Sequence, residues 1–367
     1  MTNLFKRIKK EGLKYFSAVF GTFFAVAGVF ILWSYVSNII EKNKVKQYDK
    51  IKPKVYEEKV PFFAHFHPRP DGDINVEELC EQIFLEDYPN DDKVGPIVAM
   101  SDHDNTVLVD LIMERYGRIS DLIDVETIND YTVKIYDKSD LDKDGNTTEF
   151  FYLLRSAEVT AKLKDGRSAH ILGIGITDLP KKDYSIYDVA KQLKEQGAIV
   201  IAPHPACRAV KGMGKETLTE LVEKNYVDFV EVNGSFPKTI LNLVGFDYNK
   251  KARKWAEELG LKVVADSDAH VWYDISINGK KEKRYSIIDT YVNLLNKDGF
   301  DPKDLRTYIR EKISNDEYET LEFTPHSLEL IKWLFPAVIE ILKGKSEQLG
   351  ADYPPPNLED KYRQMYK

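Results

Sequence analysis

The chain has 367 residues, of which 43% are hydrophobic and 12% aromatic, so it is long enough to bury a full core in one barrel-sized domain. Its formal net charge of −8 excludes the strongly basic balance that is typical of proteins binding duplex nucleic acid. Cys80 and Cys207 follow no CxxC spacing and make no disulfide framework, so we interpret both as packing residues.

A long uncharged run near the N-terminus comes first in chain order. Residues 15–40 follow a basic N-terminus, residues 1–14, and exceed the roughly 20 residues that a helix needs to cross a bilayer. The run predicts a single-pass transmembrane helix. A cleaved signal peptide is the alternative, because an Ala-Val-Ala triplet inside the run resembles a cleavage site, but the apolar stretch continues well past it. Basic residues flank the run on both sides, and the short basic N-terminus favours an extracytoplasmic catalytic domain.

A charged tether is expected over residues 41–59, and a folded domain over 60–295. In that domain short β-rich runs alternate with amphipathic helical runs, a pattern typical of an α/β fold with a largely parallel sheet or barrel. The seven expected strands are 60–67, 96–104, 150–161, 170–177, 198–205, 229–234 and 262–270. The expected helices are 75–84, 185–197, 215–225 and 248–260.

Two further segments carry motif-like patterns. The insert DLDKDGN, which begins at Asp140, approaches a calcium-loop pattern but has Phe151 where such a loop needs glutamate, so it predicts an ordinary hairpin turn. Residues 296–367 are expected to form a helical extension and tail. Within them, residues 327–344 form an amphipathic pattern that predicts packing on the domain, with the membrane surface as the alternative.

Histidines are concentrated at the predicted strands. Six of the seven lie in or at the ends of these strands, and only His326 lies elsewhere. The six are His65, His67, His103, His170, His204 and His270, and the accompanying carboxylates are Asp71, Asp102, Asp104, Glu158 and Asp268. The C-terminal strand ends of a parallel barrel meet on one face, so these side chains are expected to converge. A lone histidine on an apolar run is usually a core residue, but six in matching positions favour a metal centre of zinc, manganese or iron.

The chemistry of such a cluster indicates hydrolysis of a phosphate ester. Two or three divalent ions would activate a hydroxide and hold the attacking and departing oxygens during displacement at phosphorus. Arg208 lies four residues past His204 and is expected to neutralise phosphate oxygens together with a third ion. His270 or Asp268 is the candidate that protonates the leaving alcohol.

The motifs occur in a recognisable order: HFHPRPDG from His65, SDHDN around His103, SAEVT around Glu158, AHILG around His170, APHPACR around His204, and SDAH from Ser267. This ensemble resembles the PHP superfamily, the polymerase and histidinol phosphatase group of metal-dependent phosphoesterases. The resemblance implies a distorted seven-stranded (β/α) barrel with up to three divalent metals in one cleft. Two departures from the family pattern are Pro68-Arg69-Pro70 after the HxH pair and Asp266 where glycine usually precedes SDAH.

The resemblance also implies how the ligands are shared among three metals. His65, His67, Glu158 and Asp268 would hold the first, and Glu158 would bridge to a second held by His170 and His204. Asp71, His103 and His270 would hold the third. The implied activity is that of a membrane-anchored phosphoesterase acting on a small phosphomonoester or phosphodiester, including nucleotide-derived ones. The alternatives are a metal hydrolase acting on amides and a noncatalytic, metal-stabilised module that binds a phosphorylated partner.

Several polar residues near the motifs allow two interpretations. Asp102 and Asp104 would either orient imidazoles or cap the helix expected near Val107. Glu231 and Asn233 would either contact substrate or metal ligands or belong to a structural turn. Arg69 is a candidate substrate contact, with a solvated loop residue as the alternative. Strand alternation sends Arg155 to the face opposite Glu158, away from the cleft.

Overall fold

The computed structural model describes residues 57–67, 94–114, 123–143, 147–181, 184–233, 247–268, 272–277, 280–285 and 291–322, together with Val55, Cys80 and Gly145. Within these residues no helix has the length and apolar character needed to span a membrane. The expected transmembrane run 15–40, the helices 75–84 (apart from Cys80) and 327–344, and most of the tether lie outside the described residues, so these remain predictions.

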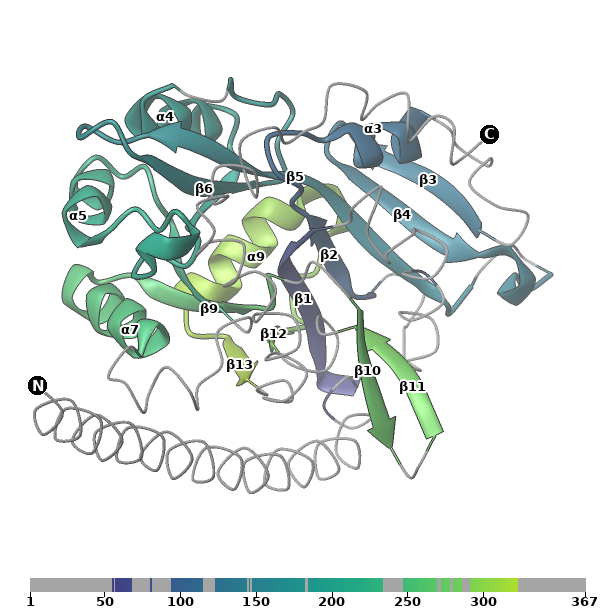
Figure 1. Cartoon of the computed structure of the whole chain (residues 1–367). Helices are drawn as coiled ribbons and strands as arrows, with labels where there is room; N and C mark the ends of the chain where they lie inside the picture. Colours follow the sequence, from purple (N-terminus) through teal and green to yellow (C-terminus); the bar gives the residue numbers. More distant parts are fainter. Residues whose placement is uncertain are drawn as a thin grey trace, which may run out of the picture.

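One mixed sheet dominates the described part of the chain (Figure 1). Its strands follow the order β13-β12-β1-β2-β5-β6-β7-β8-β9, and β4, paired with β3, adds to one side of β5. The strands are β1 Lys59–Phe66, β2 Ile97–Met100, β3 Ile123–Asn129, β4 Thr132–Asp137, β5 Phe150–Lys162, β6 Ser168–Ile174, β7 Ile199–Ala202, β8 Phe229–Asn233, β9 Lys262–Asp266, β12 Tyr291–Asn296 and β13 Tyr318–Glu322. A separate hairpin joins β10 Trp272–Ile277 to β11 Lys280–Tyr285. All seven expected strands are present, as β1, β2 and β5 to β9.

The expectation of a largely parallel sheet is only partly correct. The pairs β1–β2, β2–β5, β7–β8 and β8–β9 are parallel, whereas β6 runs antiparallel to both β5 and β7. The reason is the short connection at residues 163–167, because a parallel crossover needs a dozen or more residues. The reversal brings the beginning of β6, rather than its end, to the same side as the ends of its neighbours.

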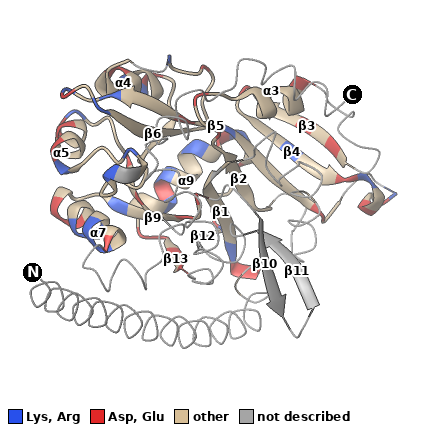
Figure 2. Ribbon diagram, in the orientation of Figure 1, with Lys and Arg blue, Asp and Glu red and all other residues tan. Residues whose placement is uncertain are grey.

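Five helices among the described residues pack against this sheet. They are α3 Val107–Glu114, α4 Ile186–Glu195, α5 Lys215–Glu223, α7 Tyr248–Leu259 and α9 Leu305–Ser314, with short 3-10 turns η1 Lys138–Asp140, η2 Arg208–Val210 and η3 Pro302–Asp304. Of these, α4, α5 and α7 lie on one face and α9 on the other. Ser185 caps α4 and Asp247 caps α7, and Gly260 ends α7 at a φ of 69°. The outward faces of these helices carry mixed charges, as Figure 2 shows for α4, α5 and α7.

The core follows from alternation along the strands. In β7, Val200 and Ala202 pack with α4, α5 and α7, whereas Ile199 and Ile201 face the opposite way and pack with β1, β5 and α9. A third cluster places α3 against β2 and β3. Cys80 and Cys207 are both buried, as expected of packing residues, and Cys80 belongs to the cluster around α3. Beyond Leu295, α9 confirms the expected helical character, but β13 extends the sheet where helix was expected.

Among the described residues no hydrogen-bonded ladder pairs β1 with β9. Side chains connect these two strands instead. Buried Asn293 of β12 accepts a hydrogen bond from the Ala265 N–H (2.8 Å) and donates to the carbonyls of Ala265 (2.9 Å) and Phe62 (3.2 Å). Asp266 accepts from the Ala64 N–H at 2.7 Å. The ends of β1 and β9, which carry the first and last histidine-rich motifs, are thereby fixed beside each other. We call this junction the β1–β9 seam.

Candidate metal centre

Seven of the predicted ligands gather where the strands of the sheet converge. They are His65, His67, His103, Glu158, His170, His204 and Asp268. All are buried except His103, whose side chain is 18% exposed. Three overlapping groups can each hold an ion, because one ligand atom from every member lies within 4.8 Å of the others: His65–His67–Asp268, His67–His103–Glu158, and Glu158–His170–His204.

Glu158 is the centre of this arrangement. Its Oε1 lies 2.8 Å from Nδ1 of His170 and 2.9 Å from Nε2 of His204. Its Oε2 lies 2.9 Å from Nδ1 of His103, 3.4 Å from Nε2 of His67 and 3.5 Å from Nε2 of His65. The carboxylate therefore divides its two oxygens between two sets of imidazoles, which is the bridging position implied by the family resemblance.

Electrostatics favour a negative carboxylate among the imidazoles. Burial by itself raises the pKa of Glu158, but the charges of His170, His65 and His103 outweigh it and hold that pKa well below its ordinary value. Burial lowers the pKa of His170 to about 4, against the opposing effect of Glu158. The His170 imidazole is consequently neutral near pH 7, the form that can act as a metal ligand.

The donor set fits divalent cations. Nε2 of His170 and Nδ1 of His204 are buried and have no hydrogen-bond partner among the described residues. Buried polar atoms are normally paired, so atoms of this kind indicate a missing ligand. Imidazole and carboxylate donors together suit zinc, manganese or iron.

Two of the ligands occupy unusual backbone conformations. His204, just after β7, has a φ of 31°, and Asp268, just after β9, has a φ of 49°. Non-glycine residues rarely adopt this region, and such positions are concentrated at functional sites. Gly212 permits the turn after His204, because a Cβ at this position would lie 2.5 Å from the His204 carbonyl oxygen and 2.6 Å from that of Cys207.

Other predicted residues have mixed outcomes. His103 was expected to share a metal with Asp71 and His270, and among the described residues it lies beside Glu158. Asp71 and His270 lie outside the described residues, as does Arg69, so their roles remain predictions. Arg208 is exposed in η2, and its role at the substrate also remains a prediction.

The polar residues flanking His103 have structural contacts. Asp104 accepts from the Thr160 N–H at 2.6 Å and so connects this loop to β5. At the start of α3 the Val107 N–H donates to Oδ1 of Asn105 at 3.2 Å, whereas capping was one of the two roles considered for Asp102 and Asp104.

Arg155 lies away from the cluster, as strand alternation predicts. Its guanidinium donates to Asp110 and Thr106 of the α3 region and to the Thr177 carbonyl.

Two buried carboxylates next to the cluster complete the site. Glu231 in β8 contacts His65 and the backbone of His204, which resolves the open sequence interpretation in favour of contact with metal-ligand candidates. Burial raises the pKa of Asp266 well above its ordinary value, and the nearby charge of Glu231 adds to that effect. In the sequence, the only sign of Glu231 or Asp266 is an acidic residue within or at the end of an apolar strand.

Comparison with known proteins connects this geometry to a family. A family model described as PHP-associated matches residues 246–275, which include α7, β9 and the SDAH motif. An uncharacterized protein of Methanocaldococcus jannaschii is 26% identical over 152 residues, a match that covers 41% of this chain and 58% of the relative. The chain thus spans less than two thirds of that relative's length.

Two solved structures have partial similarity of shape. One is a two-domain protein of Bacteroides vulgatus containing a predicted PHP-like metal-dependent phosphoesterase, with a TM-score of 0.42 and 17% identity over 72% of this chain and 65% of that one. The other is PsfC of Pseudomonas syringae, with a TM-score of 0.45 and 12% identity over 77% of this chain and 99% of that one. The match of the PHP-associated model, over the segment that carries the last expected motif, confirms the resemblance of this chain to the PHP superfamily of metal-dependent phosphoesterases.

Proposed function

We propose that this chain is a metal-dependent phosphoesterase that hydrolyses a small phosphomonoester or phosphodiester. The observation that carries the proposal is the division of the Glu158 carboxylate, with Oε1 beside His170 and His204 and Oε2 beside His103, His67 and His65. A buried carboxylate with histidines on both oxygens is suited to sharing between two cations. Two cations at close range are the arrangement used for in-line displacement at phosphorus.

The residues would divide the work as follows. His65, His67 and Asp268 would hold one ion, and His170 and His204 another, with Glu158 shared between them. Divalent ions bound there supply Lewis-acid polarisation of the phosphoryl group and lower the pKa of water. Arg208, on the exposed turn after His204, would neutralise phosphate oxygens, and Asp268 or His270 would deliver the proton to the leaving alcohol.

Hydrolysis of model substrates by the full chain tests the proposal. Purified protein supplied with zinc, manganese or iron is assayed with p-nitrophenyl phosphate, bis(p-nitrophenyl) phosphate and p-nitroacetanilide, beside Glu158→Ala and the surface control Glu220→Ala. We expect hydrolysis of the esters by the wild type, its loss in Glu158→Ala and its retention in Glu220→Ala. Turnover of the anilide alone indicates an amide hydrolase, and bound metal without any turnover indicates a binding module. Either of these outcomes contradicts the proposal.

Attachment to a membrane through residues 15–40 is part of the same proposal. The uncharged run supports it, and alkaline carbonate extraction of membranes tests it. An anchored chain stays with the membrane pellet, whereas release into the supernatant contradicts the anchor.

A further inference from the structure

Glu231 contacts two candidate ligands that belong to different metal-binding groups. Its side chain is fully buried in β8. Oε1 lies 2.6 Å from Nδ1 of His65, and Oε2 accepts a hydrogen bond of 2.6 Å from the backbone N–H of His204. His65 belongs to the group with His67 and Asp268, and His204 to the group with Glu158 and His170. One carboxylate therefore spans both groups without being a member of either.

The contact with His65 determines which ring nitrogen is available to a metal. A carboxylate oxygen accepts hydrogen bonds, so Nδ1 of His65 must carry the proton at this contact. Nε2 then presents its lone pair, and it is Nε2 that lies 2.9 Å from Nε2 of His67 and 3.5 Å from Oε2 of Glu158. A carboxylate that fixes the tautomer and orientation of a ligating imidazole is a recurring feature of metal sites.

The contact with His204 acts on the backbone instead. His204 has a φ of 31°, a conformation that costs free energy in a non-glycine residue and persists only when neighbouring contacts enforce it. The hydrogen bond from its N–H to Oε2 of Glu231 is such a contact, and it lies within the buried interior. It fixes the turn from which the imidazole reaches Oε1 of Glu158.

We infer that Glu231 is a positioning residue that couples the two metal-binding groups, by fixing the His65 tautomer with one oxygen and the strained His204 backbone with the other. The inference rests on the proposed metal-dependent function. Both oxygens of Glu231 accept from protein donors, and none of the possible metal-binding groups among the described residues includes it. Its loss is expected to weaken metal binding at both groups together, whereas loss of an ordinary ligand acts mainly on its own group.

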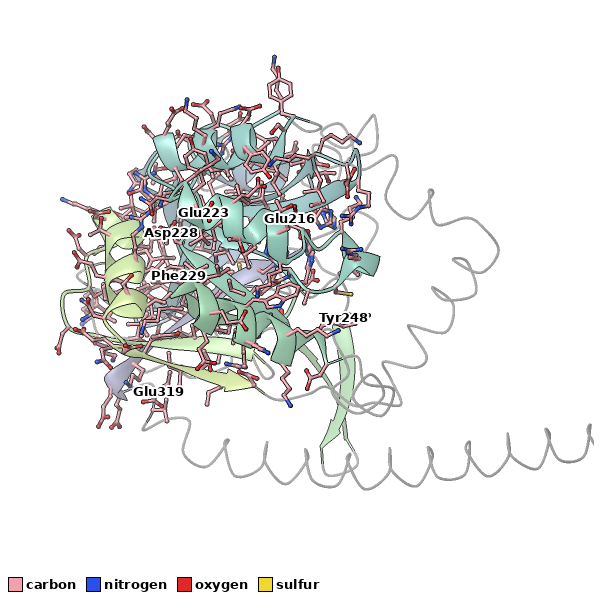
Figure 3. All side chains as sticks on the ribbon, turned by 90° about the vertical axis from the view of Figure 1, so that its left-hand side faces the viewer. Glu216, Glu223, Asp228, Phe229, Tyr248 and Glu319 are labelled. Atoms are coloured by element: carbon pink, nitrogen blue, oxygen red, sulfur yellow. The ribbon has the colours of Figure 1, made fainter. Side chains whose placement is uncertain are left out.

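Glu231→Gln is the informative substitution, because it keeps the shape of the side chain and leaves one oxygen to serve two donors. Asp228 offers a matched control. It precedes β8, next to the labelled Phe229 in Figure 3, and its Oδ2 accepts from the Val200 N–H at 2.8 Å, a strand-to-strand contact without an imidazole. Asp228→Asn therefore tests the loss of a similar, largely buried charge and its bond to the backbone away from the cluster, together with the 2.7 Å ion pair from Oδ1 to Lys194.

Competition with a chromophoric chelator measures the zinc and manganese affinity of the full chain and both variants. Glu231→Gln is expected to lower affinity by roughly 10- to 100-fold, with ester hydrolysis recovered at high metal concentration, while Asp228→Asn keeps wild-type affinity. Equal affinity in wild type and Glu231→Gln overturns the inference and leaves the proposed function intact. A wild-type chain that binds no metal overturns both.

A second measurement needs no Glu231 variant. Long-range ¹H–¹⁵N spectra of the zinc-loaded wild-type chain, assigned with His65→Asn, report which nitrogen of His65 carries the proton. A proton on Nδ1 is the expected result. A proton on Nε2 overturns the inference even if Glu231→Gln fails to fold.

Discussion

Nε2 of His204 lies 2.9 Å from Oε1 of Glu158, although 46 residues separate them in the chain. Glu158 comes from the long strand β5, and His204 from the turn that follows β7. The reversed direction of β6 between these strands completes the group, because it brings His170 to 2.8 Å from the same Oε1.

Glu158→Gln should therefore abolish tight metal binding. The amide removes the negative charge that the imidazoles share. It also replaces one of the two carboxylate oxygens, each of which lies beside imidazole nitrogens, with an NH₂ group. Ester hydrolysis is expected to fall by at least the roughly 10²- to 10³-fold that is typical for loss of one electrostatic group at a catalytic site. Equilibrium dialysis against zinc, with Glu220→Gln as surface control, checks the binding. Wild-type metal affinity in Glu158→Gln would contradict the bridging role.

Gly212→Ala should disturb the His204 turn. The added Cβ would meet the backbone carbonyl oxygens of His204 and Cys207, neither of which can move as a side chain does. Overpacking of this kind costs about 1–3 kcal/mol of stability, and we expect weaker metal binding with it. Thermal unfolding and metal titration are the measurements.

Gly173→Ala is the control for that substitution. Its Cβ would meet the flexible end of Leu193, so metal affinity should stay near wild type. Equal effects of the two alanines on metal affinity would show that the turn at Gly212 has no special role.

Asn293→Leu should open the β1–β9 seam. The substitution keeps the size of the side chain but leaves the Ala265 N–H and the Phe62 and Ala265 carbonyls without their buried partner. Unsatisfied buried groups of this kind cost about 1–3 kcal/mol each, so we expect the three together to cost at least about 3 kcal/mol. Denaturant unfolding measures it, with the exposed Asn315→Leu as control. A loss no greater than that of the control would refute the role of the seam.

Asp140 should stabilise the loop before β5 without calcium. Its Oδ2 accepts hydrogen bonds from Thr147, Thr148 and the Glu149 N–H. Burial raises the pKa of Asp140, but these bonds outweigh it and lower that pKa below the ordinary 3.8. The contribution to stability is therefore full above pH 3.8 and is lost as the pH falls through the lowered folded value.

Asp140→Ala should therefore lower the free energy of unfolding by about 1 kcal/mol at pH 7. It should change that free energy little at a pH below the lowered pKa of Asp140. Unfolding curves across pH measure the difference. Calcium should leave the melting temperature unchanged, and a calcium-dependent rise would revive the alternative of a calcium loop.

The sequence predicts most of the sheet because its central strands are apolar runs bounded by turn residues, as at 198–205. The expected helices 185–197, 215–225 and 248–260 are found for a similar reason, with apolar positions at helical spacing. The strands β3, β4 and β10 to β13 were not expected. In β13 every residue is at least partly exposed, so no apolar run marks it. The antiparallel direction of β6 was missed, although the short connection at 163–167 indicates it.

The ligands were predictable because histidine and carboxylate are unusual at the ends of apolar strands. The residues that hold these ligands in position were not predictable. Glu231 and Asp266 acquire their roles only from tertiary contacts across the seam and between strands, such as the 2.7 Å bond between Asp266 and the Ala64 N–H. Nothing in local sequence distinguishes such a carboxylate from one that ends a turn.

The metal content of the purified full chain tests the central claim most directly. Elemental analysis after removal of loosely bound ions, on wild type and Glu158→Ala side by side, gives the number of ions per chain. We expect two or three divalent transition-metal ions in the wild type and their loss in Glu158→Ala. Less than one ion per chain, unchanged after zinc, manganese or iron is added back, would contradict the claim.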